Sequence, residues 1–543
     1  MSDEVATRGP SAAAVPPFLK TPLGVALVVL AFGTAYSTIR ILASSAIGTD
    51  DAWENVYVQS LRPGYILSQP PLYEWILWAV QQGLGTGVQS FLAVKFGLMA
   101  LSAVFLFGAA RFAIRDDATA AVATFSYALF YQIGWNMLEG VTHTAVLFCA
   151  CAATTFTLSR AVRTGRWVDH VWLGLALGTG ALSKFGYPLF AGSLVAAFLS
   201  EPLLRRRLKP ARLALSVGIA LVVASPFLYW VVAGERPVLG AVADIMTEGA
   251  RQPHLVRAGT GIAKLGLSLL GFAVPLLPLV ALLFWRPLLR RAPGEDALSD
   301  AYARAYGRAI LIAIGVAILA VLATGASRLR ERHMHPLLIL LPIWLFARIE
   351  RGGVPGRRIR VFRSTILATV ALVLAVRVAG LLAPDAMFCG RTCRPAKPYA
   401  DLIAGLRAIG AGGTLIGLDR YTAGNLRVGF PEARIVMATE PLGFPEASRP
   451  PGPCWIVWEA GRKAELPFDQ AAEREKRNPN EWPAIEPDRF VIGQWRHLWK
   501  PPGFRTIGWG VRRVDPSSAS CLGGNPGSAP VGEEIASSSS PGS

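Results

Sequence analysis

The chain has 543 residues, of which 52% are apolar and 17% are charged, with a mean hydropathy of +0.40. This composition excludes an ordinary soluble enzyme and indicates a polytopic membrane protein. The net charge of +18 does not indicate a nucleic-acid partner, because its excess lies in residues 1–383, with 35 basic and 19 acidic residues, whereas residues 384–543 hold 19 and 17.

The first 21 residues form a polar, Ala- and Pro-rich tail without the features of a cleaved signal peptide. We therefore expect a tail at 1–21 followed by a retained helix. Apolar runs of spanning length predict about eleven transmembrane helices within residues 22–383. These runs are 22–43, 91–114, 118–135, 140–159, 170–183, 185–200, 213–233, 265–285, 309–324, 335–349 and 364–383.

Basic residues gather in every second loop, which predicts the orientation of the chain. They cluster near Arg111, Arg160, Arg205, Arg286 and Arg348. By the positive-inside rule these loops and the N-terminus face the cytoplasm of a bacterial inner membrane. The loop 44–90 and everything after residue 383 then lie on the periplasmic side.

Two adjacent carboxylates, Asp50 and Asp51, follow the first apolar run, and Glu54 comes one helical turn later. Carboxylates at a membrane surface are costly to desolvate, so this pair predicts a site. The alternative is that the pair caps a helix, since Asp is a common N-cap. Later in the same loop, the aromatic segment after Pro70-Pro71 predicts a helix lying in the membrane interface.

Other outside loops supply cations. Lys184 stands at the tip of a hairpin, against the positive-inside trend, and Arg328, Arg330 and Arg332 with His333 and His335 precede the tenth run. Carboxylates beside such a site suit one reaction class, in which a base activates an acceptor hydroxyl and cations hold the phosphate of a lipid-linked leaving group. Alternatively, Lys184 snorkels to the interface and the arginines bind lipid headgroups.

The loop 234–263 contains His254 together with Glu235, Asp244, Glu248 and Arg251. A single loop histidine is usually only solvated, but binding of a divalent metal with Glu235, Asp244 or Glu248 stays open. The sequence has no phosphate-binding loop or dinucleotide fingerprint after a predicted strand, so we expect no nucleotide cofactor.

The region 384–516 predicts a small periplasmic α/β domain, and the Ser-, Gly- and Pro-rich stretch 517–543 is expected to be disordered. Strands are expected at Thr414–Leu418, Arg434–Met437, Trp455–Trp458 and Thr506–Arg512, and helices near 399–410 and 467–477.

Six cysteines divide between the two regions. Cys389, Cys393, Cys454 and Cys521 lie in the outside region, where we expect a structural disulfide rather than a redox or metal site. Cys149 and Cys151 are expected to be core residues of a helix.

Short motifs follow one another along the chain: Asp50-Asp51-Ala52, Gly64-Tyr65, Pro70-Pro71-Leu72, Gly174–Lys184, Ser225–Trp230 and Arg332–Pro336. Together they resemble the family 39-like glycosyltransferases with the GT-C fold, which include protein O-mannosyltransferases, aminoarabinose transferases of lipid A and Rgt-type galacturonosyltransferases. The resemblance covers roughly residues 22–350 and is nearest to the Rgt-type subgroup. Thr142-His143 departs from the Asp that many members carry at that position.

The resemblance implies a polytopic GT-C fold, with 22–383 as the transferase domain, and transfer of a sugar from a polyprenyl-phosphate donor to a lipid or glycan acceptor of the cell envelope. Asp50 corresponds to the presumed catalytic base, Asp51 to a supporting carboxylate and Lys184 to a contact of the lipid phosphate. We list Arg332, His333, Glu54, Tyr65 and His254 as further substrate-binding candidates. A transporter of a lipid-linked or small anionic substrate and a non-catalytic scaffold are the alternatives.

Overall fold

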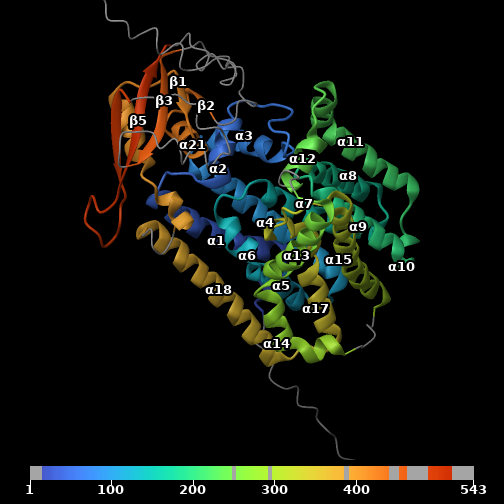
Figure 1. The fold of residues 1–543 in the computed structure, drawn as a ribbon. Helices are drawn as coiled ribbons and strands as arrows, with labels where there is room; N and C mark the ends of the chain where they lie inside the picture. The colour runs from blue at the N-terminus through green and yellow to red at the C-terminus, as the bar shows by residue number, and fades with distance from the viewer. Residues whose placement is uncertain are drawn as a thin grey trace, which may run out of the picture.

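The computed structural model describes residues 15–247, 252–290, 296–384, 390–438, 452–461 and 487–515. A bundle of helices forms most of it, and a small β-sheet lies at one end of the bundle (Figure 1). Three short helices, α2 (Thr49–Tyr57), α3 (Leu72–Leu84) and α21 (Arg420–Gly429), lie between the sheet and the bundle.

Seven of the described helices are long and apolar enough to cross a membrane. They are α1 (Pro22–Ala43), α4 (Val88–Ala113), α7 (His143–Thr164), α11 (Pro210–Ala233), α13 (His254–Ala273), α15 (Ala297–Thr324) and α18 (Gly356–Leu382). Shorter helices are α5 (Asp117–Phe125), α6 (Tyr131–Gly134), α8 (Trp167–Ala181), α9 (Tyr187–Ser200), α10 (Pro202–Arg205), α12 (Val238–Thr247), α14 (Leu276–Leu289), α16 (His335–Leu338) and α17 (Leu341–Arg351).

Three of the expected spans are wrong as continuous helices, and the total of eleven crossings stays a prediction. The run 265–285 is divided between α13 and α14, and the run 335–349 between α16 and α17. Pro275 and Pro342 stand at these two breaks, where a proline cannot continue the preceding helix. The run 118–135 is broken after α5 by the 3-10 turn η2 (Ser126–Leu129), which contains no proline.

The three breaks lie against one another inside the bundle. The Phe130 ring is 4.7 Å from that of Phe272, which in turn lies 4.9 Å from the His335 ring. The Tyr127 hydroxyl donates a hydrogen bond to the carbonyl of Ile339, between α16 and α17. Backbone groups freed within a membrane protein need such internal partners, because the hydrocarbon offers none.

The basic loops that the charge pattern assigns to one side of the membrane lie close to one another in the structure. The Arg115 backbone N–H donates to the Glu350 carboxylate at 3.0 Å, and the Arg290 guanidinium donates to the Gly352 carbonyl at 3.4 Å. Helix α2 and the C-terminal sheet share the opposite end of the bundle, where α2 packs against α21 (Figure 1).

The sheet has the strand order β2-β1-β3-β5-β4, with β2, β1 and β3 parallel and β3, β5 and β4 antiparallel. The strands are β1 (Thr414–Gly417), β2 (Arg434–Met437), β3 (Cys454–Gly461), β4 (Arg489–Gln494) and β5 (Thr506–Val514), and α20 (Tyr399–Ala408) packs on β4. The four expected strands and the helix near 399–410 are confirmed. Strand β4 and helix α21 were not predicted from the sequence. The expected helix at 467–477 and the tail 517–543 lie outside the described residues.

The cysteines also divide as expected. Cys393 and Cys454 are both disulfide-bonded, whereas Cys149 and Cys151 are free, buried thiols in α7. Cys389 and Cys521 lie outside the described residues.

Helix α21 approaches α2 so closely that one contact requires glycine. A Cβ atom on Gly424 would lie 2.2 Å from the Ala52 carbonyl oxygen. This contact joins the backbone of α21 to the backbone of α2, and neither can move aside easily. The sheet and α2 are therefore held as one packed unit.

We predict that Gly424→Ala destabilises the protein, because the added methyl group must push α21 away from α2. Overpacking of this kind typically costs about 1–3 kcal/mol. Gly412→Ala is the matched control, since a Cβ atom there meets nothing within 4 Å. Thermal unfolding of the detergent-solubilised proteins, followed by Trp fluorescence, measures the difference; equal midpoints for the two variants would contradict the close packing.

Candidate active site

Asp50 and Asp51 lie in the first turn of α2, and the N-cap position belongs to Gly48. The hypothesis that the pair serves as the helix cap is therefore wrong. Carboxylates in a first turn are favoured by the helix dipole. Successive helical residues point about 100° apart, so the two side chains enter different surroundings.

Asp51 points into the protein and is only 4% exposed. Its Oδ2 atom lies 3.6 Å from Lys95 Nζ and accepts a hydrogen bond of 3.2 Å from the Gly140 backbone N–H. Burial raises the pKa of Asp51 to about 6, although the Lys95 ammonium opposes the shift. Asp51 is thus tied to α4 and to the loop before α7.

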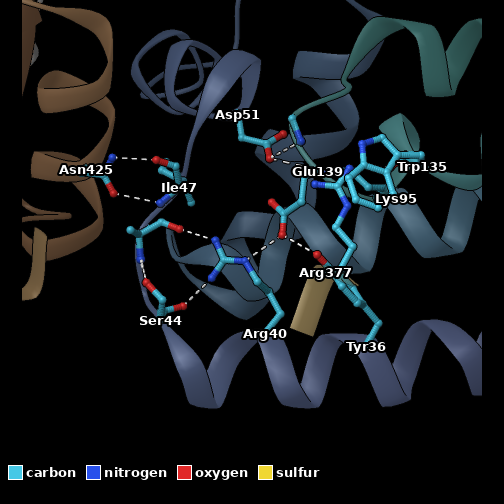
Figure 2. Close-up of polar contacts among 12 residues, drawn as sticks. Tyr36, Arg40, Ser44, Ile47, Asp51, Lys95, Trp135, Glu139, Arg377 and Asn425 are labelled. Atoms are coloured by element: carbon cyan, nitrogen blue, oxygen red, sulfur yellow. Dashed lines mark hydrogen bonds and ion pairs between the residues drawn. The ribbon is translucent and has the colours of Figure 1, made fainter. Parts of the chain in front are cut away.

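A second buried ion pair lies beside the first, as Figure 2 shows. Glu139 Oε1 accepts from Arg40 Nε at 2.9 Å and from the Tyr36 hydroxyl at 2.6 Å. Burial opposes the ionisation of Glu139, but Arg40 and Lys95 outweigh it and hold the pKa of this carboxyl below its usual value. Since Glu139 precedes Gly140, this pair fixes the loop that binds Asp51.

Asp50 faces the other way and remains partly exposed. Burial and the nearby Glu54 carboxylate raise the pKa of Asp50, while the positive charges of Arg332 and Lys184 lower it. Asp50 is therefore the carboxylate that faces the cationic loops, as the sequence analysis expected of one of the pair.

Lys184 is held in place by contacts on both sides of the α8–α9 turn. Its Nζ atom donates to Thr144 Oγ1 at 2.9 Å, and the neighbouring Leu182 carbonyl accepts from the Leu72 N–H at 3.1 Å. Burial and the charge of Arg332 lower the pKa of Lys184 to about 8. The ammonium group is thus positioned by α3 and α7.

Of the other candidates, His333 and Glu54 also lie at this end of the bundle. His333 belongs to the 3-10 turn η4 (Glu331–His333), and its Nδ1 atom accepts from the Arg330 N–H at 3.4 Å. Burial, Lys184 and Arg332 lower the pKa of His333 to about 3, so this imidazole is neutral.

Two candidates have other partners. The Tyr65 hydroxyl donates to the Ser60 carbonyl at 2.8 Å, which closes its own loop. His254 Nε2 lies 2.9 Å from the Leu322 carbonyl, where α13 begins beside the end of α15. Of the acids expected near His254, Glu235 stands in the turn after α11, whereas Glu248 and the Asp244 side chain lie outside the described residues, as does Arg251 of the same loop.

The motifs behind the family resemblance contact one another. A Cβ atom on Gly64 would lie 2.5 Å from the ring of Trp230, so only glycine allows this loop to rest on α11. Leu72, at the start of α3, is bonded to Leu182 beside Lys184. The loop at Gly64, α3, α11 and the turn at Lys184 are far apart in the sequence, but they pack together at the end of the bundle that holds Asp50 and Lys184.

Arg40, Lys95 and Glu139 were missed by the sequence analysis. A signal was present for the first two, because cations inside apolar spanning helices are rare and usually paired or functional. Glu139 carries no such signal, since it lies in a short loop and acquires its role from Arg40, which stands 99 positions earlier in the chain.

The C-terminal region also holds α2, which the sequence could not indicate. Asn425 accepts from the Ile47 N–H at 2.9 Å and donates to the Ile47 carbonyl at 2.8 Å (Figure 2). Arg427 donates to the carbonyls of Asn55 and Val58, at the end of α2. Helix α21 thus grips α2 at both ends.

Comparisons with known proteins indicate the class of protein. Residues 68–230 match the family model described as dolichyl-phosphate-mannose-protein mannosyltransferase. The chain is 27% identical over 436 residues to the lipopolysaccharide core galacturonosyltransferase RgtB of Rhizobium johnstonii, covering 80% of this chain and 87% of that protein. It is also 27% identical over 443 residues to RgtA of the same organism, covering 81% and 87%.

Among solved structures, the fold is similar to ArnT from Cupriavidus metallidurans bound to undecaprenyl phosphate. The TM-score is 0.51 at 13% identity, covering 88% of this chain and 97% of that one. Fold and relatives define the chain as a membrane glycosyltransferase with the GT-C fold. The match to the mannosyltransferase family model is limited to residues 68–230, and the transporter hypothesis gains no support from these matches.

We predict that Lys95→Met strongly destabilises the protein, because it leaves the Asp51 carboxylate buried without its counter-ion. Removing one partner of a buried pair typically costs about 3–5 kcal/mol. In the double variant Lys95→Met/Asp51→Asn no charge is left unpaired, so much of the lost stability should return. Unfolding midpoints of the two single variants and the double variant test the coupling; additive effects would contradict the ion pair.

Proposed function

We propose that the protein transfers a sugar from a polyprenyl-phosphate donor to an acceptor hydroxyl at the outer face of a bacterial inner membrane, with Asp50 as the general base. Asp50 is partly exposed and lies close enough to Lys184 and Arg332 for both positive charges to act on it, and this is the observation that carries the proposal. A base and a pair of cations that can bind phosphate are the groups that this displacement requires.

In the proposed step Asp50 removes the proton of the acceptor hydroxyl. The resulting oxygen attacks the anomeric carbon, and the bond between that carbon and the phosphate oxygen breaks. Polyprenyl phosphate leaves with the bonding electrons, and Lys184 and Arg332 stabilise its added negative charge. Attack from the side opposite the phosphate inverts the anomeric configuration.

For the sugar we propose a hexuronic acid such as galacturonic acid, with a lipopolysaccharide core as acceptor. Both Rhizobium johnstonii relatives carry that activity in their names. The outer loop before α16 supports an acidic sugar, since it holds Arg328 and Arg330 besides Arg332. These arginines offer more positive charge than a single phosphodiester needs.

The positive-inside pattern supports the orientation, with the N-terminus in the cytoplasm and both α2 and the C-terminal sheet in the periplasm. The disulfide-bonded Cys393 and Cys454 fit an oxidising compartment on that side. We retain 384–516 as a periplasmic domain that positions α2, 22–383 as the transferase domain and α3 as an interfacial helix.

We predict that Asp50→Asn lowers the rate of sugar transfer about 10²- to 10⁴-fold, the usual contribution of a general base. The assay uses purified protein, a labelled polyprenyl-phosphate uronic acid and a core acceptor. Glu201→Gln is the matched control, because this carboxylate is bonded to Arg304 at 2.9 Å at the far end of α9. Full activity of a folded Asp50→Asn variant would remove Asp50 from the mechanism.

We predict a bell-shaped dependence of kcat/KM on pH. Activity rises with pH as Asp50 ionises, above the usual carboxyl range because its pKa is raised. It falls above about pH 8, where Lys184 loses its proton. In Lys184→Arg the descending limb moves to higher pH, because a guanidinium stays charged. A descending limb that does not move in Lys184→Arg would show that another group titrates there.

A further inference from the structure

Three side chains from three different helices converge next to Asp50. Glu54 comes from α2, Glu74 from α3, and His143 from the first turn of α7. His143 Nε2 lies 3.2 Å from Glu54 Oε1 and 3.6 Å from Glu74 Oε1. One ligand atom from each residue lies within 4.8 Å of the other two.

All three side chains are buried, with exposures of 3% for Glu54, 0% for Glu74 and 5% for His143. Both carboxylate oxygens of Glu74 and Oε2 of Glu54 lack a hydrogen-bond partner within the described residues. Apart from a 3.3 Å hydrogen bond that Thr142 Oγ1 donates to Glu54 Oε1, the two carboxylates share one imidazole. No Lys or Arg within the described ranges forms an ion pair with either acid. Buried carboxylates normally need hydrogen-bond donors or cations, so this arrangement indicates a ligand.

The distances between the ligand atoms fit the tetrahedral coordination of one cation. Zinc binds carboxylate oxygen and imidazole nitrogen at about 2.0–2.2 Å, which places neighbouring ligand atoms of a tetrahedron about 3.4 Å apart. The distances of 3.2 and 3.6 Å lie on either side of that value. An imidazole ligand favours zinc or a similar transition metal over magnesium or calcium.

We propose that Glu54, Glu74 and His143 bind one Zn²⁺-type divalent cation. Its charge balances the two carboxylates, and it joins α2, α3 and α7 at their buried contact. Three protein ligands leave a fourth position open, as in zinc sites that accept water or substrate. A role beside Asp50 in transfer rests on the proposed function, but the binding itself does not.

The test is the metal content and affinity of the full-length protein, purified in detergent through a tag without histidine. After removal of metal with EDTA, Zn²⁺ is titrated by calorimetry, and bound metal is counted by mass spectrometry. We expect one Zn²⁺ per chain in the wild type, in Asp50→Asn and in the control Glu201→Gln. We expect at least tenfold weaker binding in Glu74→Gln and His143→Asn.

Co²⁺ supplies a second measurement, because a tetrahedral Co²⁺ site absorbs visible light strongly. This absorption should appear in the wild type and be lost in Glu74→Gln, whose thermal unfolding shows whether it is folded. The proposal is overturned if the folded wild-type protein binds no Zn²⁺, which would leave only a proton between the carboxylates. It is also overturned if folded Glu74→Gln and His143→Asn bind Zn²⁺ as the wild type does. Sugar transfer by Asp50→Asn is measured separately, so failure of the proposed base would leave the metal count unchanged.

Discussion

The two buried ion pairs, Asp51 with Lys95 and Glu139 with Arg40, are the constraint on which the rest of the site depends. Charges removed from water are stable only when they are paired closely, so each of these four side chains restricts the others. Because Glu139 and Gly140 are neighbours, the two pairs form one network across α1, α2, α4 and the loop before α7. This network fixes the orientation of α2.

Because α2 is fixed, the two adjacent carboxylates have different partners. Asp51 is used to hold the helix, and Asp50 is consequently presented to Lys184 and Arg332 with little freedom to turn. Glu54, on the same face one turn later, adds negative charge and meets His143. Asn425 and Arg427 of α21 form hydrogen bonds with the residues that flank α2, and these bonds prevent α2 from moving away.

Much of this arrangement could be predicted from the sequence, because apolar length and loop charge are local signals. They gave the polytopic bundle, the clustering of basic loops at one end and four strands of the sheet. The broken spans were missed because hydropathy does not distinguish a continuous helix from two pieces interrupted at Pro275 or Pro342. Asp50, Lys184 and Arg332 stood out as charges in unusual places, whereas Glu74 and Asn425 acquire their partners only through tertiary contacts.

The grip of α21 on α2 has a consequence for the order in which the protein matures. Asn425 and its partner Ile47 are 378 residues apart. The ribosome therefore completes the whole transmembrane bundle before the segment that secures α2 has been made. Until that segment has folded against α2, the helix carrying Asp50 lacks this support, so the site is completed last. A chain that ends early, before residue 420, would carry Asp50 without the structure that holds it in position.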